Sequence, residues 1–120
     1  MRARERGMVT AEIAVSLSGL AIIMLGLVWV FGVVSAQIRC VDAARDTARA
    51  LARGESVDDA RAEGERAAPP GARFAVQVSE GNATVKVSVR IRPTVPVLSR
   101  LSGVLVSGRA VVSTEPGVGT

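Results

Sequence analysis

Apolar residues are concentrated in one long segment near the start of the chain and recur in short periodic patterns after it. Residues 1–7 are polar and basic, and residues 8–38 are apolar apart from Glu12 and small hydroxyl, amide or glycine residues. No charge at all occurs in residues 13–38. Because roughly 20 apolar helical residues cross a bilayer, this run predicts a transmembrane helix with a turn or more to spare.

The helical period continues past the apolar run. Apolar residues recur three or four positions apart, with charged residues on the other faces, at Val41, Ala44, Ala48 and Leu51. One helix is therefore predicted to run from the membrane to about Arg53, with Gly54 as its stop.

A short second helix is predicted next. Ser56 is its expected N-cap, and Asp58, Asp59 and Glu63 are expected early in it, where negative charge suits the helix dipole. The run Pro69-Pro70-Gly71 is expected to end this helix.

Alternation of apolar and polar residues predicts three strands. Residues 74–79 and 84–92 alternate on either side of the turn Glu80-Gly81-Asn82, which predicts a β-hairpin closed by Pro93 and Pro96. Residues 104–113 form a third predicted strand, interrupted by Gly108.

These elements predict an α+β fold. A three-stranded sheet with one apolar face is not stable alone in water, so it needs a helix to pack against. We expect a lollipop in which a long N-terminal transmembrane helix continues into a small extracytoplasmic domain, with a short helix and a three-stranded antiparallel sheet. The predicted divisions are a leader (1–7), a transmembrane helix (8–38), a helix extension (39–54) and an α+β domain (55–120).

The amino-acid composition reduces the number of functions that the chain is expected to have. With 2% aromatic residues, the core of the domain is expected to be thin and to consist of Val, Ala and Leu. The absence of His and the single Cys argue against a metal site of the usual ligands and exclude an internal disulfide. The basic residues are scattered among acids and lack interleaved aromatics, so nucleic acid is not an expected partner despite the net charge of +4. No nucleophile beside a base and no phosphate-binding glycine loop occurs, so we expect neither enzymatic activity nor a cofactor.

A distinctive motif lies where the leader meets the apolar run. In Arg6-Gly7-Met8-Val9-Thr10-Ala11-Glu12, a basic leader ends in Gly7, and a single acid follows five positions later. This arrangement resembles a type III signal sequence, the substrate site of prepilin peptidases, and implies cleavage between Gly7 and Met8. A glycine there would offer a side-chain-free backbone to the protease and is expected to break the helix.

Glu12 has two interpretations. A carboxylate at the edge of an apolar segment costs about 3 kcal/mol on insertion scales, and such residues usually have a partner. Cleavage would free the amino group of Met8 as a candidate partner, and the resemblance to pilins implies pairing with the amine of the neighbouring subunit. Alternatively, Glu12 simply lies in the headgroup region, where acids are tolerated.

Three further segments extend the resemblance over nearly the whole chain. They are Cys40-Val41-Asp42-Ala43-Ala44-Arg45, Ala48-Arg49-Ala50-Leu51-Ala52-Arg53-Gly54 and a β-rich end that closes in Glu115-Pro116. Together with the leader they resemble the TadE-like family of minor pilins or pseudopilins, especially its actinobacterial members. Major pilins of that system typically place Tyr directly after the Glu, whereas Ile13 follows here, which favours an accessory subunit.

The resemblance implies a minor pilin or pseudopilin of a tight-adherence type IV pilus or related secretion machine, acting in pilus assembly. Its implied partners are the membrane, prepilin peptidase, other pilin or pseudopilin subunits and the inner assembly platform, in a homo- or hetero-oligomer. The N-terminus would be cytoplasmic and the C-terminal domain extracytoplasmic, in the cytoplasmic membrane or a surface pilus. Arginines flank both ends of the apolar run, so this orientation rests on the leader rather than on charge counting.

Two alternatives stay open. Val34-Ser35-Ala36 resembles an ordinary signal-peptidase site, which would release a secreted domain that begins at Gln37. The apolar run is longer than the roughly 7–15 residues of a signal-peptide core, which argues against this route. The second alternative is an uncleaved membrane anchor that carries a small interaction domain.

Cys40, one turn beyond the apolar run, also has two interpretations. It is either a small buried or interfacial residue or the site of an intermolecular disulfide in an oxidising compartment. Lipid attachment is not expected, because Gln37-Ile38-Arg39 does not form a lipobox.

Overall fold

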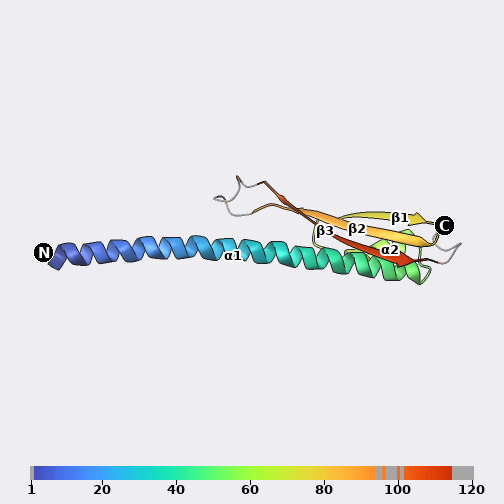
Figure 1. The fold of residues 1–120 in the computed structure, drawn as a ribbon, viewed down its shortest axis with the longest axis horizontal. Helices are drawn as coiled ribbons and strands as arrows, with labels where there is room; N and C mark the ends of the chain where they lie inside the picture. Colours follow the sequence, from blue (N-terminus) through green and yellow to red (C-terminus); the bar gives the residue numbers. More distant parts are fainter. Residues whose placement is uncertain (1, 94–95, 97–99, 101, 115–120) are drawn as a thin grey trace. The chain divides into compact units, whose positions relative to one another are not determined.

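The fold is α+β, as the sequence predicts. The computed structural model describes residues 2–93, 96, 100 and 102–114, so the terminal Glu115-Pro116 lies outside the described residues. The elements run α1 (Arg2–Ala52), α2 (Val57–Glu65), β1 (Arg73–Ser79), β2 (Asn82–Ile91) and β3 (Val104–Ser113) (Figure 1). The chain divides into two compact units, residues 1–32 and residues 33–120, and we call the second unit the head.

The first unit consists of the N-terminal part of α1. By length and composition, α1 is long and apolar enough to cross a membrane, and none of its most apolar window is buried. Large apolar side chains point outward all along this part, with exposed fractions from 43% at Leu25 to 73% at Val15 and Phe31. An unburied apolar helix of this length matches a bilayer better than the core of a soluble protein.

The predicted stop at Gly54 is confirmed, and α1 ends at Ala52. Gly54 adopts φ 88°, a left-handed conformation that glycine takes without strain. The amide of Glu55 donates to the carbonyl of Ala50 at 3.2 Å, and the amide of Gly54 donates to the carbonyl of Leu51 at 3.0 Å. This pair of bonds is a Schellman motif, which satisfies carbonyls that the helix end would otherwise leave free.

Ser56 caps α2 as predicted, and its hydroxyl accepts from the amide of Asp59 at 3.2 Å. α2 ends at Glu65, and helical bonds continue as a turn as far as Ala68, whose amide donates to the carbonyl of Gly64 at 3.1 Å. Pro69 follows directly and has no amide hydrogen with which to continue the series, so the prolines close this turn as predicted. Glu63, however, lies near the end of α2 rather than early in it. A long-range contact also fixes the turn. Arg39 in α1 donates to the carbonyls of Ala67 and Ala68 at 3.3 and 3.2 Å.

The three strands form an antiparallel sheet in the order β1-β2-β3. The hairpin turn is at Glu80-Gly81, where Gly81 adopts φ 86°, and Ser79 pairs with Asn82. β3 has the predicted bounds, but Gly108 does not interrupt it, because Gly108 pairs with Val87 in a continuous ladder.

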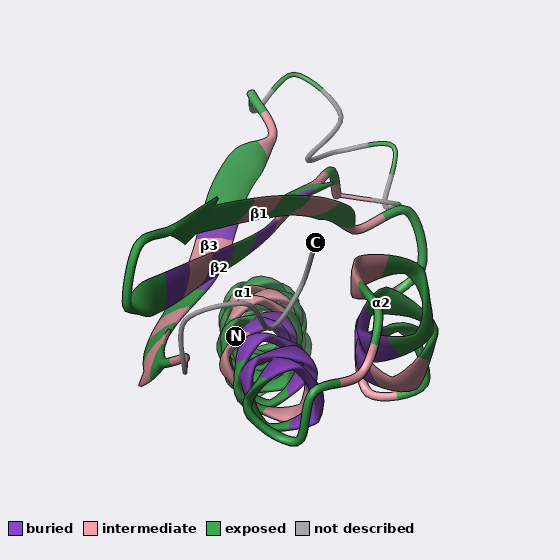
Figure 2. Ribbon diagram, turned by 90° about the vertical axis from the view of Figure 1, so that its right-hand side faces the viewer, coloured by how far each residue is buried: buried purple, intermediate pink, exposed green. Residues whose placement is uncertain are grey.

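The core of the head lies between one face of the sheet and the two helices (Figure 2). Among the described residues, eight of the fourteen buried apolar side chains are Ala and four are Val, which confirms the predicted thin core. Small side chains fill little volume, so such a core is dense only if backbones approach closely.

Two glycines provide that close approach to α1. A Cβ at Gly108 would lie 2.5 Å from the carbonyl carbon of Cys40 and 2.6 Å from its oxygen. A Cβ at Gly64 in α2 would collide with the Thr47 hydroxyl and lie 2.9 Å from the carbonyl oxygen of Ala43. Only glycine fits at either position without a shift of the neighbouring backbone.

We predict that Gly108→Ala destabilises the head by about 1–3 kcal/mol, because the new methyl group must push β3 away from α1. Faster hydrogen exchange of the β3 amides in the full-length, detergent-solubilised protein would measure the loss. Gly103→Ala is the matched control, because its methyl group would meet only the flexible stems of Arg90 and Arg92. Equal losses in both variants would contradict the explanation.

Candidate processing site and assembly residues

The predicted processing site lies inside α1. Gly7 and Met8 are both helical, so the expectation that Gly7 breaks the helix is wrong. A single helical glycine costs only about 1 kcal/mol, and Ala, Arg and Glu in the leader are good helix formers. Gly7 is exposed, and a Cβ added to it would meet no atom within 4 Å. Met8 is 71% exposed, so both residues of the peptide bond are accessible.

One side-chain bond supports the helix around the Gly7-Met8 peptide. The Thr10 hydroxyl donates to the carbonyl oxygen of Arg6 at 2.9 Å, directly before Gly7. Cleavage of the Gly7-Met8 bond therefore requires local unwinding of the first turns of α1. Gly7 makes that unwinding easier, because glycine gains the most backbone freedom when a helix opens.

Glu12 is exposed on α1, one helical turn after Met8. Residues four apart lie on the same face of a helix, so Met8 and Glu12 are neighbours along α1. Within the part of the chain that the structure describes, no ion pair involves Glu12. Its carboxylate is exposed to the surroundings of α1.

Cys40 is fully buried in the core of the head, at 0% exposure. Burial raises the pKa of the Cys40 thiol, and the neighbouring Arg39 guanidinium partly opposes the shift. Both the burial and the raised pKa reduce the reactivity of the thiol, since the thiolate is the reactive form. This environment favours the interpretation of Cys40 as a small buried residue.

Polar side chains that the sequence did not single out fasten α1 to its neighbours. Gln37 donates to the carbonyl of Ser107 in the edge strand β3 at 2.8 Å, on the opposite side from the bonds that Arg39 makes. The Thr47 hydroxyl instead donates within α1, to the carbonyl of Ala43 at 2.9 Å, at the place where Gly64 of α2 lies against it. Local periodicity could not reveal these contacts, because two of the three join residues far apart in sequence.

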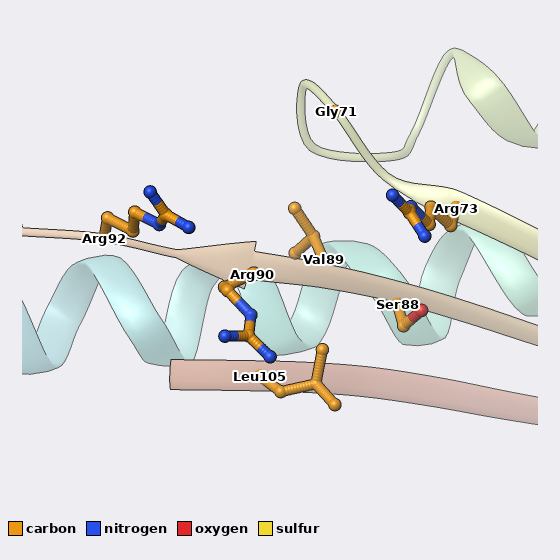
Figure 3. Close-up of a pocket in the computed structure, with 7 residues that line it drawn as sticks. All are labelled: Gly71, Arg73, Ser88, Val89, Arg90, Arg92 and Leu105. Atoms are coloured by element: carbon orange, nitrogen blue, oxygen red, sulfur yellow. The ribbon is translucent and has the colours of Figure 1, made fainter. Parts of the chain in front are cut away.

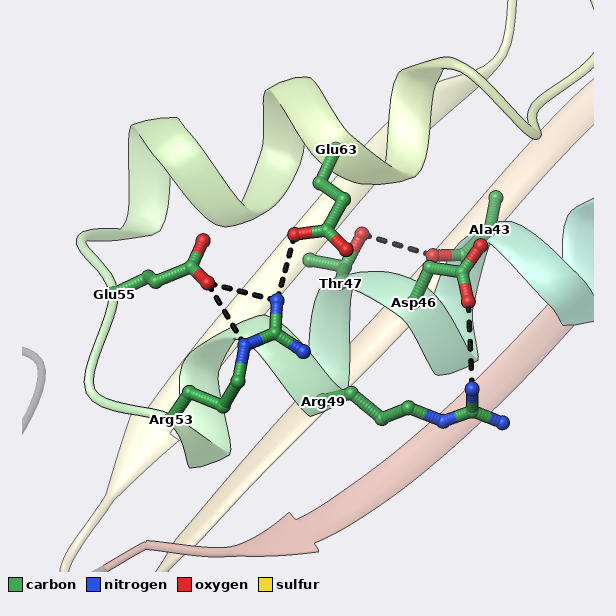
Figure 4. Close-up of polar contacts among 7 residues, drawn as sticks. All are labelled: Ala43, Asp46, Thr47, Arg49, Arg53, Glu55 and Glu63. Carbon is green, nitrogen blue, oxygen red and sulfur yellow. Dashed lines mark hydrogen bonds and ion pairs between the residues drawn. The ribbon is translucent and has the colours of Figure 1, made fainter.

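The end of α1 is joined to α2 by one arginine (Figure 4). The Arg53 guanidinium contacts Glu55 at 2.7 Å and Glu63 at 2.8 Å. These two ion pairs span the turn between the helices. Because they are exposed to solvent, they orient α2 relative to the end of α1 more than they stabilise the head. Asp46 and Arg49 form a longer pair at 3.9 Å on the same surface.

No protein-family model, curated protein or solved structure matches the chain. Its function is therefore inferred from its own residues and from their placement.

We predict that a maleimide labels Cys40 about a hundredfold more slowly in the folded, detergent-solubilised protein than after denaturation, because the head must open first. Mass spectrometry of the labelled chain measures the rate. A Cys introduced by Ser113→Cys, at an exposed position, is the control and should react at once. Rapid labelling of native Cys40 would instead support the intermolecular disulfide.

Proposed function

We propose that this chain is a minor pilin or pseudopilin subunit of a tight-adherence type IV pilus or a related secretion machine. In this proposal prepilin peptidase cuts after Gly7, and the mature subunit takes part in pilus assembly as a structural protein rather than an enzyme. The N-terminus is cytoplasmic, and the head is extracytoplasmic.

The observation that carries the proposal is the uninterrupted helix α1. One helix contains the Gly7-Met8 bond, the lone carboxylate of Glu12 and an unburied apolar span, and it continues into the core of the head. Removal of the leader would leave such a helix intact and membrane-held, ready to pack beside the helices of other subunits. The exposed apolar surface needs a covering, which either lipid or other helices can supply.

The extent of the head supports a membrane segment that ends before Val33. Its core includes Ala36, and Val33 packs against that core, so residues from Val33 onward belong to the head. Residues 13–32 remain for the bilayer, and at 1.5 Å per residue they span about 30 Å, the thickness of its hydrocarbon core.

The same packing bears on the alternative of a secreted domain. Cleavage by ordinary signal peptidase after Ala36 would remove both Ala36 and Val33 from the head. It would also cut within the helix, directly before Gln37, whose side chain holds the edge of β3. A secreted product would thus lose part of its own core, which argues against cleavage after Ala36.

We predict that the mature protein begins at Met8 and that Gly7→Asp prevents this processing, because a charged side chain would block the approach of the protease. Intact mass and N-terminal sequencing of the membrane fraction from the native host would measure it. Gly19→Ala, which also has open space around it, is the control and should be processed normally.

The other outcomes are equally informative. A mature chain that starts at Gln37 would establish the secreted domain and overturn the proposal. An unprocessed Met1 would leave an uncleaved membrane anchor.

We further predict that Glu12→Gln leaves cleavage intact but lowers incorporation into filaments or assembly complexes by about tenfold or more, because a neutral amide cannot form a charged pair with a free amine. Co-purification of tagged subunits would measure incorporation, with mass confirming the start at Met8. Glu5→Gln, in the discarded leader, is the matched control. Normal incorporation of Glu12→Gln would favour the view that Glu12 merely lies among the headgroups.

A further inference from the structure

The sheet face that points away from α1 and α2 carries a set of positive charges. Side chains alternate across the sheet, and Ala83, Val85, Val87 and Val89 of β2 face the core. The register therefore places four basic residues on the opposite face, which we call the cationic face: Arg73, Lys86, Arg90 and Arg109.

The charges on the cationic face repel one another. Lys86 lies directly opposite Arg109 in the β2–β3 ladder, and like charges at such positions destabilise a sheet. Among the described residues, the ion pairs involve arginines of α1, of α2 and of the turn between them, and none from the cationic face. An anionic partner from outside the head would relieve this repulsion.

Part of the cationic face is hollowed (Figure 3). A hollow of about 600 Å³ is lined by Arg73, Arg90 and Arg92, with Ser88 and Leu105 between them. Leu105 is 61% exposed, so the surface offers apolar area as well as charge. Arginine beside exposed apolar area is typical of protein interfaces. The described residues of this face include no aromatic ring for stacking on nucleic-acid bases.

The opposite charge is concentrated on α2 of the same chain. Ala60 and Gly64 face the core, so the outward stripe consists of Asp58, Ala62 and Glu65. Asp58 has no ion-pair partner among the described residues, and Glu65 has only an exposed contact with Arg61 at 3.4 Å. The small Ala62 between the two acids leaves room for a flat surface to approach.

We propose that the cationic face of one head docks on the outward stripe of α2 in a second copy of the chain. Within one head this contact cannot form, because α2 packs under the inner face of the sheet (Figure 2). Each copy carries both surfaces, so the contact is head-to-tail and repeats from copy to copy. The inference deepens the proposed function and rests on it, since it supplies a specific contact between subunits.

Reciprocal charge reversal tests the contact in the full-length protein in detergent micelles. The sheet variant carries Arg73→Glu and Arg90→Glu, and the helix variant carries Asp58→Arg and Glu65→Arg. The control carries Arg45→Glu and Arg49→Glu, which make the same change in charge as the sheet variant but on an exposed part of α1. Energy transfer between two labelled populations at low ionic strength measures association.

We expect each variant alone to associate about tenfold more weakly than the unmodified chain, whereas the control is unchanged. A mixture of the sheet variant and the helix variant should regain association, because every contact between the two variants then joins opposite charges. Added salt should weaken association of the unmodified chain.

Association that survives both reversals would overturn the contact. So would a sheet variant that associates normally but no longer binds phosphatidylglycerol vesicles, because the partner of the cationic face would then be lipid phosphate. The mass of the mature chain is measured separately. Failure of this contact is therefore distinguishable from failure of the processing route.

Discussion

The head depends on the close approach of two backbones to α1. Gly108 brings β3 against Cys40 from one side, and Gly64 brings α2 against Ala43 and Thr47 from another. With a core made mainly of alanine and valine, there is little side-chain volume to fill a wider gap. Dispersion forces fall off steeply with distance, so shorter separations between backbones replace the contacts that large side chains would make.

The same constraint explains the change in side-chain size along α1. In the first unit α1 exposes large residues such as Ile22, Leu25 and Phe31, whereas in the head it buries mainly alanine. Large side chains suit a helix whose surroundings are fluid or can be exchanged, because they add apolar area without needing a particular packing partner. Alanine suits a helix with fixed neighbours, because its small side chain allows a strand and a second helix to lie against α1 at once. A single helix can therefore serve as both membrane anchor and core element.

Local signals in the sequence predicted most of the fold. Caps, turns and alternation depend on neighbouring residues, so Gly54, Ser56 and Gly81 could be interpreted correctly from the sequence alone. Long-range contacts could not. Gly108 suggested an interruption of β3, because its partner, the backbone at Cys40, is distant in sequence. The bonds from Arg39 to the chain after α2 likewise join residues far apart in sequence.

The candidate site was less predictable than the fold, because its residues are expected to act on molecules other than this chain. The motif singled out Gly7, Met8 and Glu12, but helix propensity along the leader outweighed the single glycine, so the Gly7-Met8 bond is helical. The cationic face had no local signature at all. Its basic residues are spread over three separate strands, and only the register brings Lys86 beside Arg109. A thin core has little stability to spare for such repulsion, which is the strongest reason to look for a partner on that face.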